Sequence, residues 1–172
     1  MSIKYWQHLS IIGVLIVISH HAFGQESLDQ RDHSFALAAG VAIENNLANK
    51  TSSSGSTLSA EFTPIEDVLE IEVGTTLLNS SGEQELAEEV LFKSPYRLSS
   101  TSELDIGIGT QFSRKLQGAD SASSFGMAFA LEFMFWPSKE IGWSFNPEYG
   151  YGLGNSKGEQ TIGASIEILF GW

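Results

Sequence analysis

The carboxylates of Asp and Glu are the most prominent group of side chains in this sequence that could take part in chemistry. The chain of 172 residues has 21 Asp and Glu against 9 Lys and Arg, with 4 His and no Cys, which gives a formal net charge of −12. Without cysteine, neither a disulfide nor a cysteine-ligated metal site can form. An acidic chain without a basic stripe repels nucleic acid, so no nucleic-acid partner is expected.

Enzymatic sites built on acids or on histidine find little support in the residue pattern. Paired carboxylates can cleave glycosides, and a histidine beside a hydroxyl can activate a nucleophile. After the first 24 residues, however, His33 is the only histidine, and its neighbour Ser34 would point to the opposite face of a strand. The glycines of 150–158 resemble a phosphate-binding loop, but no helix follows them. No His or Cys spacing indicates a metal. We therefore expect no catalytic, cofactor or metal site.

The N-terminus has the pattern of a cleaved secretory signal peptide. Lys4 provides a positive charge, an apolar run follows over 9–19, and Ala22 and Gly24 place small residues before a cleavage point. The alternative is a membrane anchor, which would need about 20 apolar residues. The expected organisation is a signal peptide over 1–24, a short periplasmic segment over 25–33 and a folded domain over 34–172.

Large apolar residues recur at every second position in eight segments of the folded domain. In 123–136, for example, Phe125 and Phe129 share one face, while Gly126 and Ala128 share the other. A period of two predicts β-strands. The expected strands are 34–44, 57–64, 69–77, 89–98, 103–112, 123–136, 141–154 and 161–172.

The connections between these segments alternate in expected length. Long polar stretches follow the first, third, fifth and seventh segments, whereas short turns follow the second, fourth and sixth. One of the long stretches, 81–89, is expected to hold a single turn of helix inside a loop. This alternation favours an all-β, eight-stranded, antiparallel, up-and-down barrel.

The composition of the two strand faces separates a membrane barrel from a soluble one. In a soluble barrel the bulky face would line the interior, and long polar side chains would face water. Here the second face is mostly Gly, Ala and Ser, which suit the narrow inside of an eight-stranded barrel. The bulky face would then contact lipid, and closure would leave no unpaired backbone edge in hydrocarbon. The pattern favours the transmembrane barrel.

The C-terminal residues IEILFGW carry a family resemblance. An aromatic residue, Trp172, stands last and in register with the bulky face, which resembles the terminal signature read by the barrel-assembly machinery of bacterial outer membranes. Over 34–172 the chain resembles the small eight-stranded outer-membrane barrels of the OmpA transmembrane-domain, OmpX and OmpW type. The resemblance implies a monomer in the outer membrane, in contact with lipid and lipopolysaccharide, with both termini in the periplasm and the long loops outside. Aromatic girdles are expected from Tyr96, Trp136 and Trp143 near the short turns and from Tyr149 and Tyr151 near the long loops.

The charged residues of the strands fall on the inward face by parity. They are Glu44, Glu61, Glu70, Glu72, Glu103, Asp105, Glu132, Glu148 and Glu167, against Lys93 and Arg97. One interpretation is structural, with salt bridges that fill and rigidify the interior. The other is a cation-lined water path. The excess of acids requires wet rims, protonation, or entry of cations and water.

Counting from the turns gives a specific arrangement of this polar set. We expect Arg97 to form a cationic centre held by Glu70 and Glu103. On the facing wall, Glu132, Glu148 and Glu167 should form an acidic cluster.

The function expected from the sequence is a non-enzymatic structural, envelope or surface-interaction role. A narrow cation-preferring channel is the alternative, and a lipid A-modifying enzyme is a third possibility.

Overall fold

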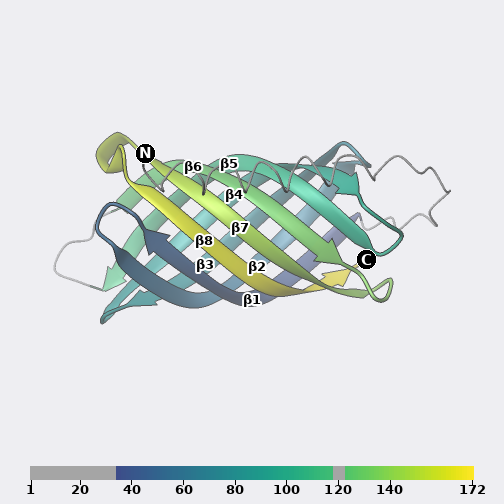
Figure 1. Cartoon of the computed structure of the whole chain (residues 1–172), viewed down its shortest axis with the longest axis horizontal. Coiled ribbons are helices and arrows are strands. Elements are labelled where there is room, and N and C mark those ends of the chain that lie inside the picture. Colours follow the sequence, from purple (N-terminus) through teal and green to yellow (C-terminus); the bar gives the residue numbers. More distant parts are fainter. Residues whose placement is uncertain (1–33, 118–122) are drawn as a thin grey trace, which may run out of the picture. The chain divides into compact units, whose positions relative to one another are not determined.

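The computed structural model describes residues 34–117 and 123–172, which form one closed barrel of antiparallel strands (Figure 1). The expected signal peptide, the segment 25–33 and His33 lie outside these residues. In the described ranges, no helix has the length and apolar content needed to cross a membrane. The strands are β1 Phe35–Asn46, β2 Thr51–Ile65, β3 Leu69–Ser80, β4 Glu83–Arg97, β5 Ser102–Gln117, β6 Ser123–Phe135, β7 Ile141–Leu153 and β8 Gln160–Gly171.

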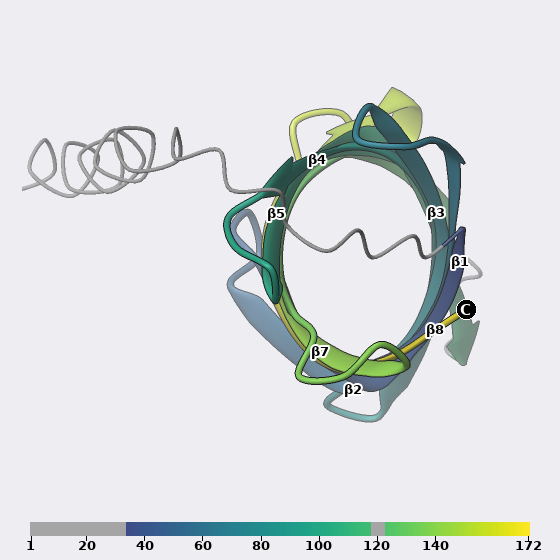
Figure 2. The same cartoon turned by 90° about the vertical axis from the view of Figure 1, so that its right-hand side faces the viewer.

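Each strand pairs with its neighbours in sequence, and β1 also pairs with β8 to close the sheet (Figure 2). Ala39, for example, lies opposite Leu58 of β2 on one side and Ile168 of β8 on the other. The amide of Trp172 donates to the carbonyl of Phe35 at 2.9 Å and so extends the closing ladder to the last residue. The expected eight-stranded, antiparallel, up-and-down barrel is confirmed.

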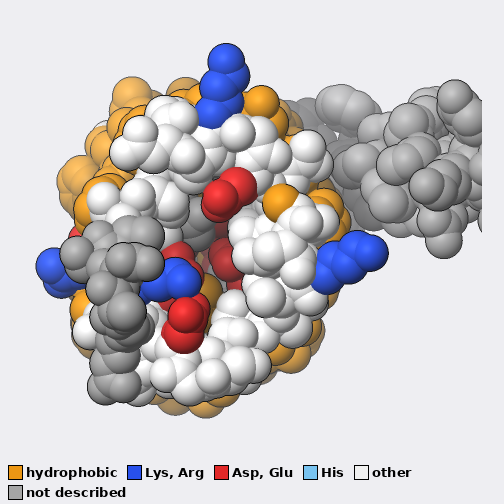
Figure 3. Space-filling view, turned by 90° about the vertical axis from the view of Figure 1, so that its left-hand side faces the viewer, with side chains coloured by type: hydrophobic (Ala, Val, Ile, Leu, Met, Phe, Trp, Pro, Cys, Tyr) orange, Lys and Arg blue, Asp and Glu red, His pale blue; other side chains and the backbone are white. Residues whose placement is uncertain are grey.

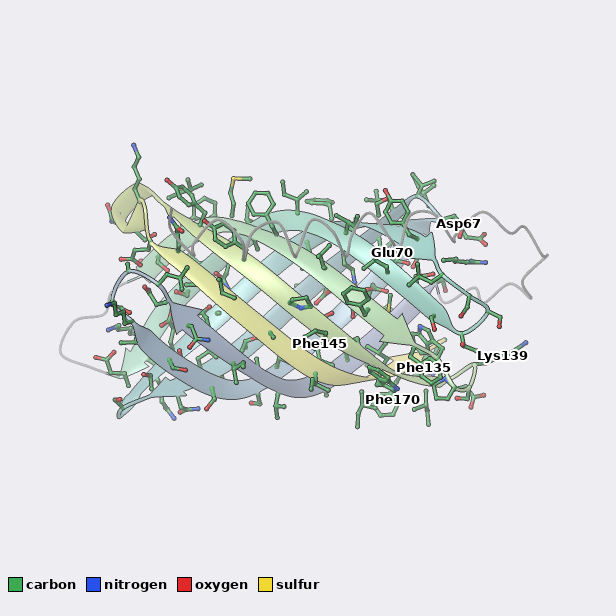
Figure 4. The ribbon with its side chains drawn as sticks, viewed as in Figure 1. Asp67, Glu70, Phe135, Lys139, Phe145 and Phe170 are labelled. Atoms are coloured by element: carbon green, nitrogen blue, oxygen red, sulfur yellow. The ribbon has the colours of Figure 1, made fainter. Side chains whose placement is uncertain are left out.

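Side chains alternate between the two surfaces of the barrel as the period of two predicts. Phe129 on β6 is 43% exposed on the outer surface, whereas its neighbour Ala128 is fully buried inside. Phe145 and Phe170 also lie on the outer surface (Figure 4). The outer surface is therefore apolar, and the interior is lined mainly by small and charged residues.

The long loops expected after the first and third strands are wrong. The strands next to them continue into turns of a few residues, 47–50 between β1 and β2 and 81–82 between β3 and β4. Ser54 opposite Asn79, and Glu85 opposite Lys115, are polar pairs of the ladders in these extensions. Such stretches resemble loops in sequence because their few large apolar residues do not recur at every second position.

The helical turn expected in 81–89 is also wrong. This segment forms a turn and the start of β4. Ser81 and Gly82 both have positive φ, 44° and 89°, and make a tight hairpin turn. Glycine adopts this left-handed conformation without steric cost, which accounts for the turn at this point. The barrel thus has two unlike ends: a terminal end, with both described chain ends and the turns 66–68, 98–101 and 136–140, and a polar end formed by the strand extensions.

Candidate functional site

A buried lysine occupies the middle of the barrel interior. Lys93 projects inward from β4, its side chain is 1% exposed, and its ammonium contacts the carboxylate of Glu61 on β2. The same nitrogen lies 2.5 Å from Glu132 Oε2 on β6, 3.0 Å from Glu72 Oε2 on β3 and 3.6 Å from Asp105 Oδ2 on β5. We call Lys93 and these four carboxylates the lysine plug. It connects five of the eight strands through one ammonium group.

Small residues next to Lys93 make room for its side chain. In the ladder Lys93 lies opposite Gly107 of β5, and a Cβ at Gly107 would lie 3.1 Å from Lys93 Cγ and 3.6 Å from Ala130 Cβ. A larger residue at Gly107 would crowd the aliphatic part of the lysine. The small residue at 107 on the inward face therefore leaves room for the ammonium to reach carboxylates on distant strands.

An apolar cluster narrows the interior on the side of the terminal end. It contains Trp136 and Met134, together with Leu169, Ala36 and Ala38. Trp136 was expected in an aromatic girdle on the outer surface, and this expectation is wrong, because the residue is only 6% exposed. Its ring lies over Gly142, where a Cβ would come within 2.7 Å of the indole.

Trp143 keeps the outward position expected of a girdle residue and packs its ring 5.7 Å from that of Phe135. The inward position of Trp136 continues the parity of Glu132 and Met134 on β6. Sequence reasoning therefore missed a signal that was present in the strand itself.

The polar end of the barrel is hollow. A cavity of about 420 Å³ opens there, and we call it the vestibule (Figure 3). Its charged lining residues are Glu44, Glu83, Glu85, Lys115 and Glu159. A smaller cavity of about 60 Å³ lies deeper, with Lys93 and several carboxylates in its wall, including Glu89 and Glu148. Acidic side chains thus line the interior from the vestibule to the lysine plug.

Arg97 does not form the expected centre. It is 26% exposed, and its guanidinium lies 3.2 Å from Asp67, 3.8 Å from Glu66 and 3.9 Å from Glu103. The Glu103 contact was expected, but no ion pair joins Arg97 to Glu70. Arg97 is the last residue of β4 and lies close to the β2–β3 turn at the terminal end, where Figure 4 places Asp67. Lys93, four residues earlier, occupies the centre instead.

The three acids of the expected facing cluster line the same 60 Å³ cavity. Two of them, however, also have partners outside the cluster. Glu132 contacts Lys93, and Glu167 accepts hydrogen bonds from Ser165 at 2.6 Å, Asn146 at 3.2 Å and Ser59 at 3.5 Å. The neutral donors that hold Glu167 were not anticipated, although their inward parity could have indicated them.

Comparison with solved structures gives the same architecture. Neisserial surface protein A matches with a TM-score of 0.68 and 15% identity, over 81% of this chain and 97% of that one. The chain has the fold of the small outer-membrane β-barrels. Ail, the attachment invasion locus protein of Yersinia pestis, matches with a TM-score of 0.57 and 12% identity, over 80% and 97% of the two chains. The outer membrane protein OprG from Pseudomonas aeruginosa gives 0.57 and 13%, over 83% and 97%.

No family model and no curated protein matches the sequence. The expected resemblance to small eight-stranded outer-membrane barrels is confirmed at the level of the fold.

The lysine plug makes a prediction that separates Lys93 from Arg97. Lys93→Met should lower the free energy of unfolding by about 3–5 kcal/mol, because it leaves buried carboxylates without their cation. Arg97→Met, the matched control, should cost about 1 kcal/mol or less, since its partners are partly in water. Urea unfolding of the refolded barrel, followed by tryptophan fluorescence, measures both. Equal losses in the two variants would contradict the central position of Lys93. Addition of Glu132→Gln to Lys93→Met should restore part of the stability.

Proposed function

We propose that the chain is an integral outer-membrane β-barrel protein with a non-enzymatic structural, envelope or surface-interaction role and an interior filled by side chains. The observation that carries the proposal is the inverted distribution of side chains. Large apolar residues cover the outer surface, whereas a lysine and its carboxylates lie inside.

The exposed apolar surface supports a lipid environment. Val41, Ile166 and Ile168 are 65%, 59% and 54% exposed, and such residues recur on every strand. A protein in water rarely exposes a contiguous apolar patch larger than a few hundred Å². In a bilayer the same surface contacts lipid chains, so its apolar area is not exposed to water. Strands of 12 to 16 residues exceed the roughly 9–11 that a tilted transmembrane strand needs.

The unlike ends of the barrel support an orientation. We place the terminal end in the periplasm and the polar strand extensions outside the cell. The extensions carry Ser, Thr and Glu beyond the apolar band, as expected of segments that reach into water. Trp172 lies on the outer surface, 63% exposed and with its ring 6.0 Å from that of Phe35. This position suits a terminal signature that the assembly machinery can read.

The proposal includes the expected route and surroundings. The chain would be exported with the signal peptide 1–24, inserted by the barrel-assembly machinery and held as a monomer among lipid and lipopolysaccharide. A lipid A-modifying activity has less support, because residues 34–117 and 123–172 contain no histidine to act as a general base.

The apolar surface makes a prediction about assembly. Phe129→Lys should block insertion or lower the free energy of unfolding by about 2–4 kcal/mol, because Phe129 faces outward near the middle of β6 and would place a cation in hydrocarbon. Ala128→Ser, the neighbouring inward control, should insert normally. Refolding into lipid vesicles, followed by the shift in electrophoretic mobility on heating, measures the folded fraction. A neutral Phe129→Lys with a disruptive Ala128→Ser would favour a soluble barrel.

A cation-preferring channel is the second candidate, supported by the acids that line the interior from the vestibule inward. The lysine plug and the apolar cluster around Trp136 oppose it, since both lie across the path. We expect the purified protein to give no discrete openings in planar bilayers. Frequent cation-selective openings would replace the structural role with the channel.

A further inference from the structure

A second group of acids lies beside the lysine plug and shares two members with it. Glu61, Glu70 and Asp105 project from β2, β3 and β5, and each offers one carboxylate oxygen such that all three oxygens lie within 4.8 Å of one another. We propose that these three carboxylates bind one divalent cation that prefers oxygen ligands, namely Ca²⁺. We call them the cation site.

Three carboxylate oxygens of the cation site, on Asp105 and Glu70, are buried without a hydrogen-bond donor. Asp105 is fully buried, and neither of its carboxylate oxygens accepts a hydrogen bond. Its nearest cation is the Lys93 ammonium, at 3.6 Å. Glu70 is 7% exposed, and although its Oε1 accepts a hydrogen bond from Thr63 at 3.4 Å, its Oε2 accepts none. A buried carboxylate oxygen without a partner is costly, so both side chains indicate a missing positive group.

Lys93 cannot supply all of the positive charge that this region requires. It contacts Glu61, Glu72 and Glu132 more closely than Asp105, and no ion pair joins it to Glu70. The plug and the cation site together set one ammonium against five carboxylates, a formal charge of −4. One divalent cation would halve that charge at the point where the acids lack partners.

The type of the ligands and their placement on three strands favour Ca²⁺ over other metals. Carboxylates without His or Cys select hard cations. Ca²⁺ binds oxygens at about 2.3–2.6 Å in flexible geometry, so two oxygens on opposite sides of the ion lie about 5 Å apart. The three oxygens lie within 4.8 Å of one another, close enough to share one such ion. Mg²⁺ demands a tighter octahedron and retains its waters, which suits carboxylates on three separate strands less well.

A shared proton is the competing explanation. If Asp105 or Glu70 were protonated, one carboxyl group could donate to the other, and no metal would be needed. The two explanations differ in their response to calcium, and this difference defines the experiment.

The test uses the full chain refolded in detergent, stripped with a chelator and titrated with CaCl₂ by calorimetry. We expect one saturable Ca²⁺ per chain, weaker binding of Mg²⁺, and a higher midpoint of thermal unfolding in Ca²⁺ than in chelator. Asp105→Asn and Glu70→Gln should each weaken Ca²⁺ binding about tenfold or more, because each removes a charged ligand. Glu148→Gln, the matched control, removes an inward carboxylate outside the site and should leave the affinity unchanged.

Two results would overturn the proposal. One is the absence of saturable Ca²⁺ binding together with a thermal midpoint indifferent to Ca²⁺, which would favour the shared proton. The other is equal binding in Asp105→Asn, Glu70→Gln and Glu148→Gln, which would place the ion on other carboxylates. If Asp105→Asn does not refold, Glu70→Gln decides the question, because the Glu70 side chain is less buried than that of Asp105 and already has one hydrogen bond.

Discussion

The pairing of β1 with β8 is the constraint on which the rest of this structure depends. Once the sheet closes, it has no edge and only two surfaces, and the period of two assigns every residue to one of them. The outer surface is broad and receives Phe, Ile, Leu and Val, whereas the inner surface is narrow and accepts mainly Gly, Ala, Ser and a limited set of charges. Closure also leaves no open strand edge in the wall formed by the described residues, as a lipid environment requires.

The interior contents follow from this narrowness. With little water inside, charged side chains must find partners on other strands, and Lys93 reaches carboxylates on β2, β3, β5 and β6. A buried ion pair is weak evidence for net stability, but a pair that loses one partner is strongly destabilised. The lysine plug therefore favours a single register of five strands over any arrangement that would separate Lys93 from its acids. Trp136 and its apolar neighbours narrow the interior toward the terminal end, and the vestibule opens at the polar end.

The sequence predicted the strands and their faces because alternation is a local property, and it holds over segments such as 123–136. The strand prediction failed at 81–89. There Gln84, Leu86 and Glu88 together are about as polar as the residues between them, so that this part of a paired strand resembles a loop in sequence. Parity placed the acids, Lys93 and Arg97 inside. It could not identify Lys93 as the central cation, because contacts across the interior depend on the stagger of strands that are distant in sequence. The hydrogen bonds of Asn146 and Ser59 to Glu167 arise in the same way.

The central claim is that the apolar outer surface of the barrel contacts lipid, and the chain's lack of cysteine allows a direct measurement. Single cysteines placed along β6 from Phe125 to Phe133 can carry nitroxide labels in the protein refolded into lipid vesicles. Collision rates with lipid-soluble oxygen should alternate with a period of two and peak at the outward positions Phe125, Met127, Phe129, Leu131 and Phe133. Uniform rates, or peaks at Gly126, Ala128, Ala130 and Glu132, would contradict the account.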